Sequence, residues 1–317
     1  MIQANEIAAA FGLPCLLSGD MQTALQLWED LYQNRANWQK ERVKPLRLPA
    51  MIARELKRLA LTEFVLDTKD TELQLPLQHT KQMLRQKLDY GIASGGLLLK
   101  PYYHNGLQID FVAQNQYLPV RYTNDACTAV ICPEELLLEK RCYTRLEFHQ
   151  FDERVHTHTI QQRCFRSPTP GTLGLECDLS EVPQWANLLP QKTYYDVSQP
   201  LFAMFQMPEA NNIDPTSPLG VSAYADAVDL IHDADVHWER ILWELESSER
   251  AIDASEDLFR FHPGTNQPIL PKGRERMYHC LEKTGTGNTI FNTFSPEIRD
   301  TSYFNALNQI LRRIESA

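Results

Sequence analysis

The chain has 317 residues, of which 43% are hydrophobic and 23% charged, and its formal net charge at pH 7 is −10. This length can hold two domains, or one extended subunit with several parts. The acidic charge argues against simple nucleic-acid binding, because such binding needs lysine and arginine to displace counterions from phosphates. An acidic protein is still compatible with DNA that slides past without adhering.

Helical periodicity dominates the first hundred residues. Helices are predicted over 21–34, 49–67 and 82–94, with a short polar break over 71–75. The third helix ends at Gly95-Gly96, which is typical of a helix C-terminus.

From Leu97 onward the hydrophobic period is that of strands. A mostly antiparallel set is predicted, with strands over 97–103, 107–112, 120–122, 127–132, 141–151 and 156–166. Asn105-Gly106 is a strong hairpin signal between the first two strands. A turn around 151–154 joins the last two. The predicted fold class is therefore α+β.

The segment 200–222 is the most informative part of the chain. An apolar, strand-like run ends at Pro208 and passes through Asn211-Asn212 and Asp214-Pro215. A helix is then predicted from Ser217-Pro218, because serine can cap a helix and proline fits its first position. We interpret this segment as a hinge between two architectural parts.

The helix after this hinge is predicted over 218–252 and has two distinct faces. Its apolar residues follow alternating steps of three and four, apart from Asp235, and form a seam for a neighbour. The seam consists of Val221, Tyr224, Val228, Ile231, Trp238, Leu242 and Leu245. Asp226, Asp229 and Asp233 form a second stripe, for which a solvated helix face is the simplest interpretation.

A third module is predicted over 253–296, rich in glycine, proline and short strand-like pieces, before a final helix over 301–316. Its local basic cluster is either a solvated surface or a contact for DNA phosphate or an acidic partner. The cluster consists of Lys272, Arg274, Arg276 and Lys283. The glycines of 284–289 lack the Gly-Lys-Ser/Thr ending of a phosphate loop and indicate a flexible loop or hairpin tip.

The most metal-like group lies in the predicted strands and consists of Cys142, His149, His156, His158 and Cys164. A hairpin through Asp152 would bring Cys142 near Cys164. No paired Cys-x-x-Cys or His-x-x-x-His spacing supports a zinc site, so ordinary strand residues are the favoured interpretation. No catalytic residue, metal or other cofactor is predicted.

The seven cysteines are scattered and form no disulfide framework, which indicates a reducing compartment. The apolar patch 7–17 lacks a basic leader and is broken by Gly12-Leu13-Pro14, so a signal peptide is not expected. No apolar run approaches the roughly 20 residues needed to span a bilayer. We expect a cytosolic, soluble protein without a membrane partner.

Several of these segments resemble portal proteins of long-tailed bacteriophages, in the branch labelled minor capsid protein. The resemblance covers nearly the whole chain and is most specific over 200–222, which holds Asn211-Asn212-Ile213-Asp214 and Ser217-Pro218-Leu219-Gly220. The other segments are Trp28 to Tyr32, Leu88 to Gly96 with the lysine-bearing strand after it, Tyr143 to His149, Pro296 to Asp300 and Leu307 to Leu311.

The resemblance implies a dodecameric ring at one capsid vertex, assembled in the host bacterial cytoplasm and kept in the virion. Such a ring conducts double-stranded DNA, and it binds the terminase large subunit, head–tail connector proteins and capsid or scaffold proteins. By this resemblance 1–216 is the wing, 217–252 the stem helix, 253–298 a small α/β clip and 299–317 a returning helix. Family members continue through a tunnel loop and a crown of helices, so the expected subunit lacks the crown.

Within this interpretation Asp226, Asp229 and Asp233 are candidate tunnel-lining residues, since a ring of carboxylates repels phosphate. Lys272, Arg274, Arg276 and Lys283 are candidate clip contacts. The chain itself performs no chemistry, because the ATPase of the motor is a separate protein. Two alternatives stay open: a metal-dependent hydrolase that uses the Cys/His strand region, and a phage adaptor that forms no ring.

Overall fold

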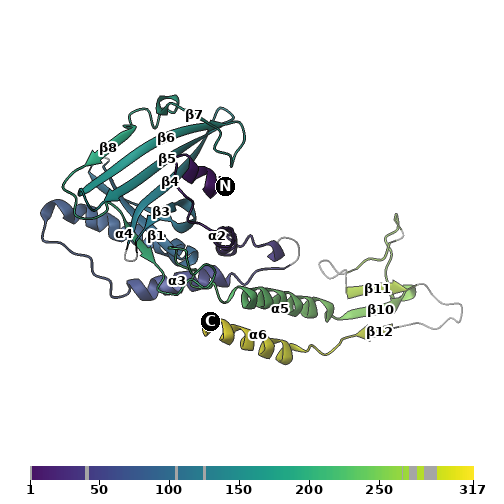
Figure 1. Ribbon diagram of the computed structural model, residues 1–317. Coiled ribbons are helices and arrows are strands. Elements are labelled where there is room, and N and C mark those ends of the chain that lie inside the picture. The colour runs from purple at the N-terminus through teal and green to yellow at the C-terminus, as the bar shows by residue number, and fades with distance from the viewer. Residues whose placement is uncertain are drawn as a thin grey trace. The chain divides into compact units, whose positions relative to one another are not determined.

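The computed structural model describes residues 2–39, 43–103, 106–123, 126–265, 267–270, 277–281 and 291–317. It combines helices with mainly antiparallel sheets, so the predicted α+β class is confirmed (Figure 1). The chain forms two compact units. Unit 1 comprises Met1–Asn37 and Arg47–Asp226, and unit 2 comprises Trp38–Leu46 and Ala227–Ala317.

The helices of unit 1 are α1 (Ala4–Ala9), α2 (Gly19–Tyr32), α3 (Leu48–Leu61) and α4 (Thr71–Ser94). Short 3-10 turns are η1 (Asn37–Gln39), η2 (Gln114–Gln116) and η3 (Leu179–Glu181). The predicted break over 71–75 is wrong, because α4 already begins there. The Asp70 side chain caps this helix by accepting a hydrogen bond from the Glu72 amide at 2.9 Å. The predicted stop at Gly95 is confirmed, since Gly95 has a left-handed φ of 91°.

The first sheet of unit 1 consists of three strands in the order β2-β1-β9. Their bounds are Gly96–Tyr103 for β1, Leu107–Ala113 for β2 and Ala203–Gln206 for β9. Both pairings are antiparallel. The hairpin predicted at Asn105-Gly106 is confirmed, because Tyr103 of β1 pairs with Leu107 of β2.

The second sheet of unit 1 has the strand order β3-β4-β5-β6-β7, and β8 also pairs with β6. The bounds are β3 (Leu118–Tyr122), β4 (Cys127–Leu138), β5 (Arg141–Asp152), β6 (Thr157–Ser167), β7 (Leu175–Cys177) and β8 (Gln191–Tyr194). The antiparallel ladder of β5 and β6 confirms the predicted hairpin after Phe151. A buried cluster that includes Ile7, Ile131 and Leu146 joins α1 to this sheet, and the Phe11 ring lies 4.8 Å from that of Phe148.

Unit 2 contains two helices and a three-stranded sheet (Figure 1). The elements are α5 (Val228–Ser247), β10 (Ala251–Ser255), the 3-10 turn η4 (Glu256–Leu258), β11 (Tyr278–Leu281), β12 (Phe291–Phe294) and α6 (Asp300–Glu315). The strand order is β11-β10-β12, with β10 parallel to β11 and antiparallel to β12. Helices α5 and α6 pack against each other.

The helix predicted over 218–252 is shorter than expected. Residues 218–227 form bends, turns and irregular backbone in place of a helix, and the Ser217 hydroxyl accepts a hydrogen bond from the Leu219 amide at 3.3 Å. At the other end, Ala251 and Ile252 already belong to β10. The described part of 253–298 holds strands and the turn η4.

Among the helices of the described part of the chain, none combines the length and the apolar character that a membrane span requires.

Candidate functional site

The segment between β9 and α5 is held in a buried junction of unit 1. The Gln114 side chain is fully buried, and its Nε2 donates hydrogen bonds to the carbonyl oxygens of Ser94 and Gly220, both at 2.7 Å. Its Oε1 accepts a hydrogen bond from the Gly220 amide at 3.1 Å. Since one side chain satisfies both peptide groups of Gly220, the chain is fixed at this point without regular secondary structure.

Two glycines make this junction possible. A Cβ on Gly95 would lie 2.5 Å from the carbonyl oxygen of Gly220, and a Cβ on Gly220 would lie 2.2 Å from that of Gly95. Both distances are far inside van der Waals contact, and backbone atoms cannot rotate away. The segments 88–96 and 200–222 therefore meet backbone to backbone at Gly95 and Gly220.

Further contacts extend the junction along the segment. The Met207 amide donates to the Gly95 carbonyl at 3.0 Å, and the Ala223 amide donates to the Ile92 carbonyl at 3.1 Å. Asn211 closes the turn, because its Nδ2 donates to the Leu219 carbonyl at 2.9 Å and its Oδ1 accepts from the Asp214 amide at 2.8 Å. The predicted turn through Asn211-Asn212 is thus built by the first asparagine.

The three acidic candidates for a tunnel lining do not share one helix. Asp226 precedes α5 and lies in unit 1, where its Oδ1 accepts a hydrogen bond from Asn212 Nδ2 at 2.5 Å. Asp229 and Asp233 are four residues apart in the first turns of α5, and both are exposed. The predicted helical stripe is therefore corrected to Asp229 and Asp233, which lie on one face.

The apolar seam predicted for α5 matches the buried side of this helix only in part. The buried residues of this helix are Ile231, Ala234, Asp235, Ile241 and Glu244. Of these, only Ile231 belongs to the predicted seam, and Leu245 is 43% exposed. Val228, Trp238 and Leu242 of the predicted seam are half-buried, so the buried side of α5 overlaps with the seam and also takes in the carboxylates of Asp235 and Glu244.

Asp235, the exception in the predicted pattern, is almost completely buried in unit 2. Its Oδ2 accepts hydrogen bonds from Trp38 Nε1 at 3.1 Å and Gln39 Nε2 at 2.9 Å. Its Oδ1 accepts a hydrogen bond from the Leu46 amide at 2.8 Å. A buried carboxylate needs such donors, and here it ties both ends of the segment 38–46 to α5.

Polar contacts fix α5 and α6 in an antiparallel arrangement. Glu244 near the end of α5 bonds to the Arg299 guanidinium before α6, at 2.7 and 3.0 Å. This hydrogen bond lowers the pKa of Glu244. His237 Nε2 donates to the Tyr303 carbonyl at 3.0 Å. Because later residues of α5 contact earlier residues of α6, the two helices run antiparallel.

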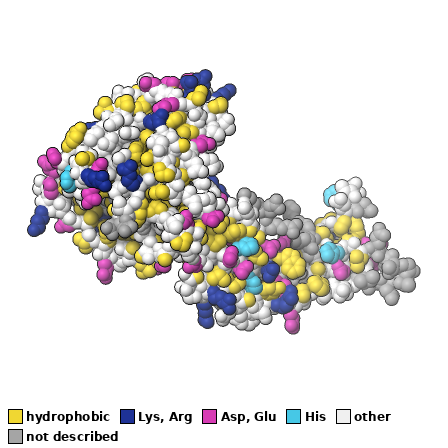
Figure 2. All heavy atoms as spheres, viewed as in Figure 1, with side chains coloured by type: hydrophobic (Ala, Val, Ile, Leu, Met, Phe, Trp, Pro, Cys, Tyr) yellow, Lys and Arg dark blue, Asp and Glu magenta, His cyan; other side chains and the backbone are white. Residues whose placement is uncertain are grey.

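The basic candidates for clip contacts, Lys272, Arg274, Arg276 and Lys283, lie outside the described residues, as does the glycine loop 284–289. On the face drawn in Figure 2, acidic and basic side chains are interspersed.

The Cys/His group of the strands does not converge on one point. Cys142 pairs with Ser167 across the β5–β6 ladder, so it does not lie opposite Cys164. Within the described ranges, no group of three or more His, Cys, Asp or Glu side chains could hold a metal ion. His149 and His158 are neighbours, but their ring nitrogens bond to each other and to protein groups. These ring nitrogens are therefore already used in hydrogen bonds within the protein.

A buried polar network surrounds these histidines, and sequence reasoning did not predict it. Glu147 of β5 accepts hydrogen bonds from Lys100 Nζ at 2.7 Å and Arg145 Nη1 at 2.9 Å. Gln162 Nε2 donates to the same carboxylate at 3.2 Å. Burial alone would raise the pKa of Glu147, but the His149 hydrogen bond and the two cations hold it well below its usual range. The pKa of Lys100, which burial alone would lower, is raised by Glu147.

The network continues as a chain of hydrogen bonds from the Leu201 amide through His158 and His149 to Glu147. The Leu201 amide donates to His158 Nδ1 at 3.3 Å, so the proton of neutral His158 lies on Nε2. That proton is donated to His149 Nδ1 at 3.1 Å, and His149 Nε2 then donates to Glu147 at 2.7 Å. This chain of hydrogen bonds connects Leu201, just before β9, with Glu147 in the centre of the sheet.

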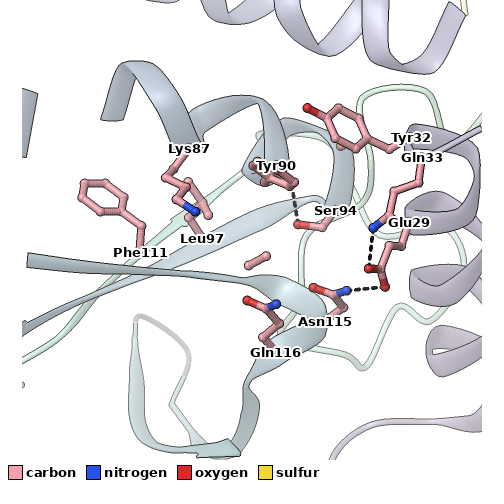
Figure 3. A pocket seen from close by; sticks show the side chains of 12 residues that line it. Glu29, Tyr32, Gln33, Lys87, Tyr90, Ser94, Leu97, Phe111, Asn115 and Gln116 are labelled. Carbon is pink, nitrogen blue, oxygen red and sulfur yellow. Dashed lines mark hydrogen bonds between the residues drawn. The ribbon is translucent and has the colours of Figure 1, made fainter. Parts of the chain in front are cut away.

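A cavity of about 250 Å³ adjoins the junction in unit 1. Figure 3 shows Asn115 at its wall beside Glu29, to which Asn115 Nδ2 donates at 2.6 Å. Asn115 Oδ1 is buried without a hydrogen-bond partner in the described part of the chain. Lys87 and Tyr90 line another side, with the Lys87 ammonium 5.6 Å from the centre of the Tyr90 ring. The lining of the cavity combines charged, polar and apolar side chains.

A comparison with protein-family models finds no match for this chain, and a comparison with curated proteins finds none.

Proposed function

We propose that this chain is a subunit of a ring-shaped phage portal that conducts double-stranded DNA. The observation that carries the proposal is the order of parts in unit 2: helix α5, a small sheet, and helix α6 returning antiparallel to α5. The resemblance to portal proteins implies this order of stem helix, clip and returning helix. The order of elements adds support because it was not among the sequence motifs that suggested the family.

The junction of unit 1 gives further support. The resemblance draws on 88–96 and on 200–222, which are far apart in sequence, and these segments pack against each other through Gly95 and Gly220. The junction holds the segment that precedes α5 in a defined conformation within unit 1. Asp229 and Asp233 are exposed acidic residues on α5 and are the candidates for a wall from which DNA is repelled.

In this proposal the partners are further copies of the chain, the DNA, the terminase large subunit, connector proteins and capsid or scaffold proteins. The protein belongs to the virion and performs no chemistry itself. An adaptor that forms no ring is the alternative with the same fold, and the assembly state separates the two.

The deciding experiment is light scattering of the purified chain, with negative-stain images of the same fraction. We expect closed rings of about a dozen subunits with a central hole. A monomer at all protein concentrations, with and without capsid proteins, would reject the portal and favour the adaptor.

A second experiment tests the face of α5 in the assembled ring. The variants Asp229→Cys and Asp233→Cys are treated with a bulky thiol reagent, and Glu153→Cys in the exposed turn after β5 serves as the control. We expect protection of both α5 positions in the ring and labelling of the control. Equal labelling of all three positions would remove the tunnel-lining role.

A further inference from the structure

Two cysteines of unit 1 lie directly opposite each other on neighbouring strands. Cys164 of β6 and Cys177 of β7 are Cα partners in the antiparallel register. Their sulfur atoms are 3.4 Å apart, and both residues are free thiols. No other function described above uses this pair.

The backbone already has the geometry that a disulfide needs. Directly opposite residues of an antiparallel pair have Cα atoms about 4.5–5.5 Å apart. Disulfides accept Cα separations of about 4.4–6.8 Å. Because the sulfurs are already in contact, a small rotation of the two side chains brings them to bonding distance without displacing either strand.

The two thiols differ in access. Cys164 is 1% exposed and lies in a cluster with Tyr143, Leu179, Val182 and Trp185. Cys177 is only partly buried at the edge of the sheet. Burial raises the pKa of Cys164 to about 12 and also raises the pKa of Cys177. Since the thiolate is the reactive form, the pair stays reduced under mild conditions and reacts faster as the pH rises.

We propose that Cys164 and Cys177 form an oxidisable site that closes into an intrachain disulfide on exposure to a low-molecular-weight disulfide. The Cys177 thiolate attacks the oxidant, forms a mixed disulfide and releases one small thiol. The Cys164 thiolate then attacks the Cys177 sulfur and releases the second small thiol. The two protein thiols are oxidised, the oxidant is reduced to two thiols, and the protons of the protein thiols pass to these products.

The disulfide would strengthen a weak edge of the sheet. Strand β7 has three residues, pairs with β6 and is the last strand in the order of this sheet. A covalent link across 165–176 restricts the unfolded chain and holds β7 in place. This inference goes beyond the portal proposal and does not depend on it, because it concerns a single subunit.

The experiment treats the full chain with oxidised glutathione under native conditions at neutral and at mildly alkaline pH. Peptide mapping without reduction should recover Cys164 linked to Cys177, with a mass lower by two hydrogen atoms, and the linkage should form faster at the higher pH. The Tm should rise by roughly 5–10 °C, and a reductant should reverse the rise.

Two variants control the experiment. Cys177→Ser should abolish both the linkage and the rise in Tm. Cys142→Ser removes a buried cysteine of the neighbouring strand β5 and should leave both unchanged. Recovery of Cys164 and Cys177 as free thiols or as separate glutathione adducts after prolonged treatment would overturn the proposal, as would a linkage of either residue to a different cysteine.

Discussion

At the scale of single residues, the buried carboxylate of Glu147 is the group whose loss should cost most. The side chains of Glu147, Lys100 and Arg145 are 11%, 11% and 14% exposed, so a neutral replacement removes the buried charged partner of two cations. Lys100 and Arg145 then keep only the more exposed carboxylates of Asp110, at 3.5 Å, and Glu134, at 2.6 Å. We expect Glu147→Gln to lower the free energy of unfolding by about 3–5 kcal/mol. Urea denaturation measures the change.

The matched control is Glu176→Gln. Glu176 also pairs with an arginine, Arg163, across neighbouring strands, but its side chain is 51% exposed. An ion pair of this kind contributes only about 0–1 kcal/mol. Equal losses of unfolding free energy in the two variants would show that burial of the Glu147 network does not contribute to stability.

The histidine pair predicts a loss of stability in acid. Burial, with a smaller contribution from His149, lowers the pKa of His158 to about 4. Between about pH 6.5 and pH 4 the unfolded chain therefore binds more protons at this residue than the folded chain, and stability falls as the pH falls through this window. We expect the Tm to drop over this range at constant ionic strength.

The variant His158→Gln separates this effect from general acid denaturation. Glutamine can still accept a hydrogen bond from the Leu201 amide and donate one to His149, but it does not titrate. The Tm of the variant should depend less steeply on pH. An identical slope in both proteins would contradict the role assigned to His158.

The junction of unit 1 predicts a strong effect of one methyl group. In Gly220→Ala the new Cβ would collide with the Gly95 carbonyl, so the segment before α5 must move. We expect a loss of roughly 2–4 kcal/mol in unfolding free energy and faster amide exchange at Ala223. Gly19→Ala is the control, since nothing lies within 4 Å of a Cβ at Gly19. A wild-type urea midpoint for Gly220→Ala would refute the close approach.

At the scale of elements, the attachment of 38–46 to α5 depends on Asp235. Removal of this carboxylate in Asp235→Ala leaves the amide of the half-buried Leu46 without its acceptor, at a cost of about 1–3 kcal/mol for each donor that loses its partner. Hydrogen exchange should show faster exchange at Leu46. Asp233→Ala, two residues away on the exposed face, should leave this amide protected. Equal exchange in both variants would contradict the attachment.

Strands could be predicted from the sequence because their signals are local. Alternating hydrophobicity and turn residues define β1, β2, β5 and β6 to within a residue or two. The start of α4 was missed because Leu73 and Leu75 are exposed and Pro76 interrupts the pattern, although Asp70 is a typical cap. The start of α5 was placed too early because Ser217-Pro218 suits a tight turn as well as a helix.

The candidate site could be predicted only in part. Its sequence segments were recognised, but their meeting through Gln114 depends on contacts between residues 106 positions apart. The Glu147 network joins β1, β5 and β6 and has no signature in any single strand. Asp235 stood out as a break in an apolar pattern, and only the structure shows the donors that satisfy it.

At the scale of the whole molecule, the portal proposal makes a prediction about charge. The variant with both Asp229→Lys and Asp233→Lys replaces two exposed acidic groups of α5 by basic ones in every subunit. We expect assembled rings of this variant to retain duplex DNA at low salt, with retention falling steeply as salt rises, because counterion release drives such binding. Filter binding measures the retention.

A control variant places the same charges elsewhere. Glu63→Lys with Asp67→Lys changes two exposed acidic residues at the same spacing of four, in unit 1. Rings of this variant should retain much less DNA. Equal retention by both variants would show that net charge, and not the position on α5, governs contact with DNA.

The small sheet of unit 2 affects which changes in chain length this protein can tolerate. Ala254 of β10 pairs with Phe291 of β12, so the two ends of the chain segment between them lie next to each other in the sheet. When the ends of a segment are already clamped together, doubling its length costs only about 0.6 kcal/mol of closure entropy. Changes of length in this stretch that spare β11 should therefore leave the α5–α6 pair intact. The protein can vary this stretch while the two helices stay constant.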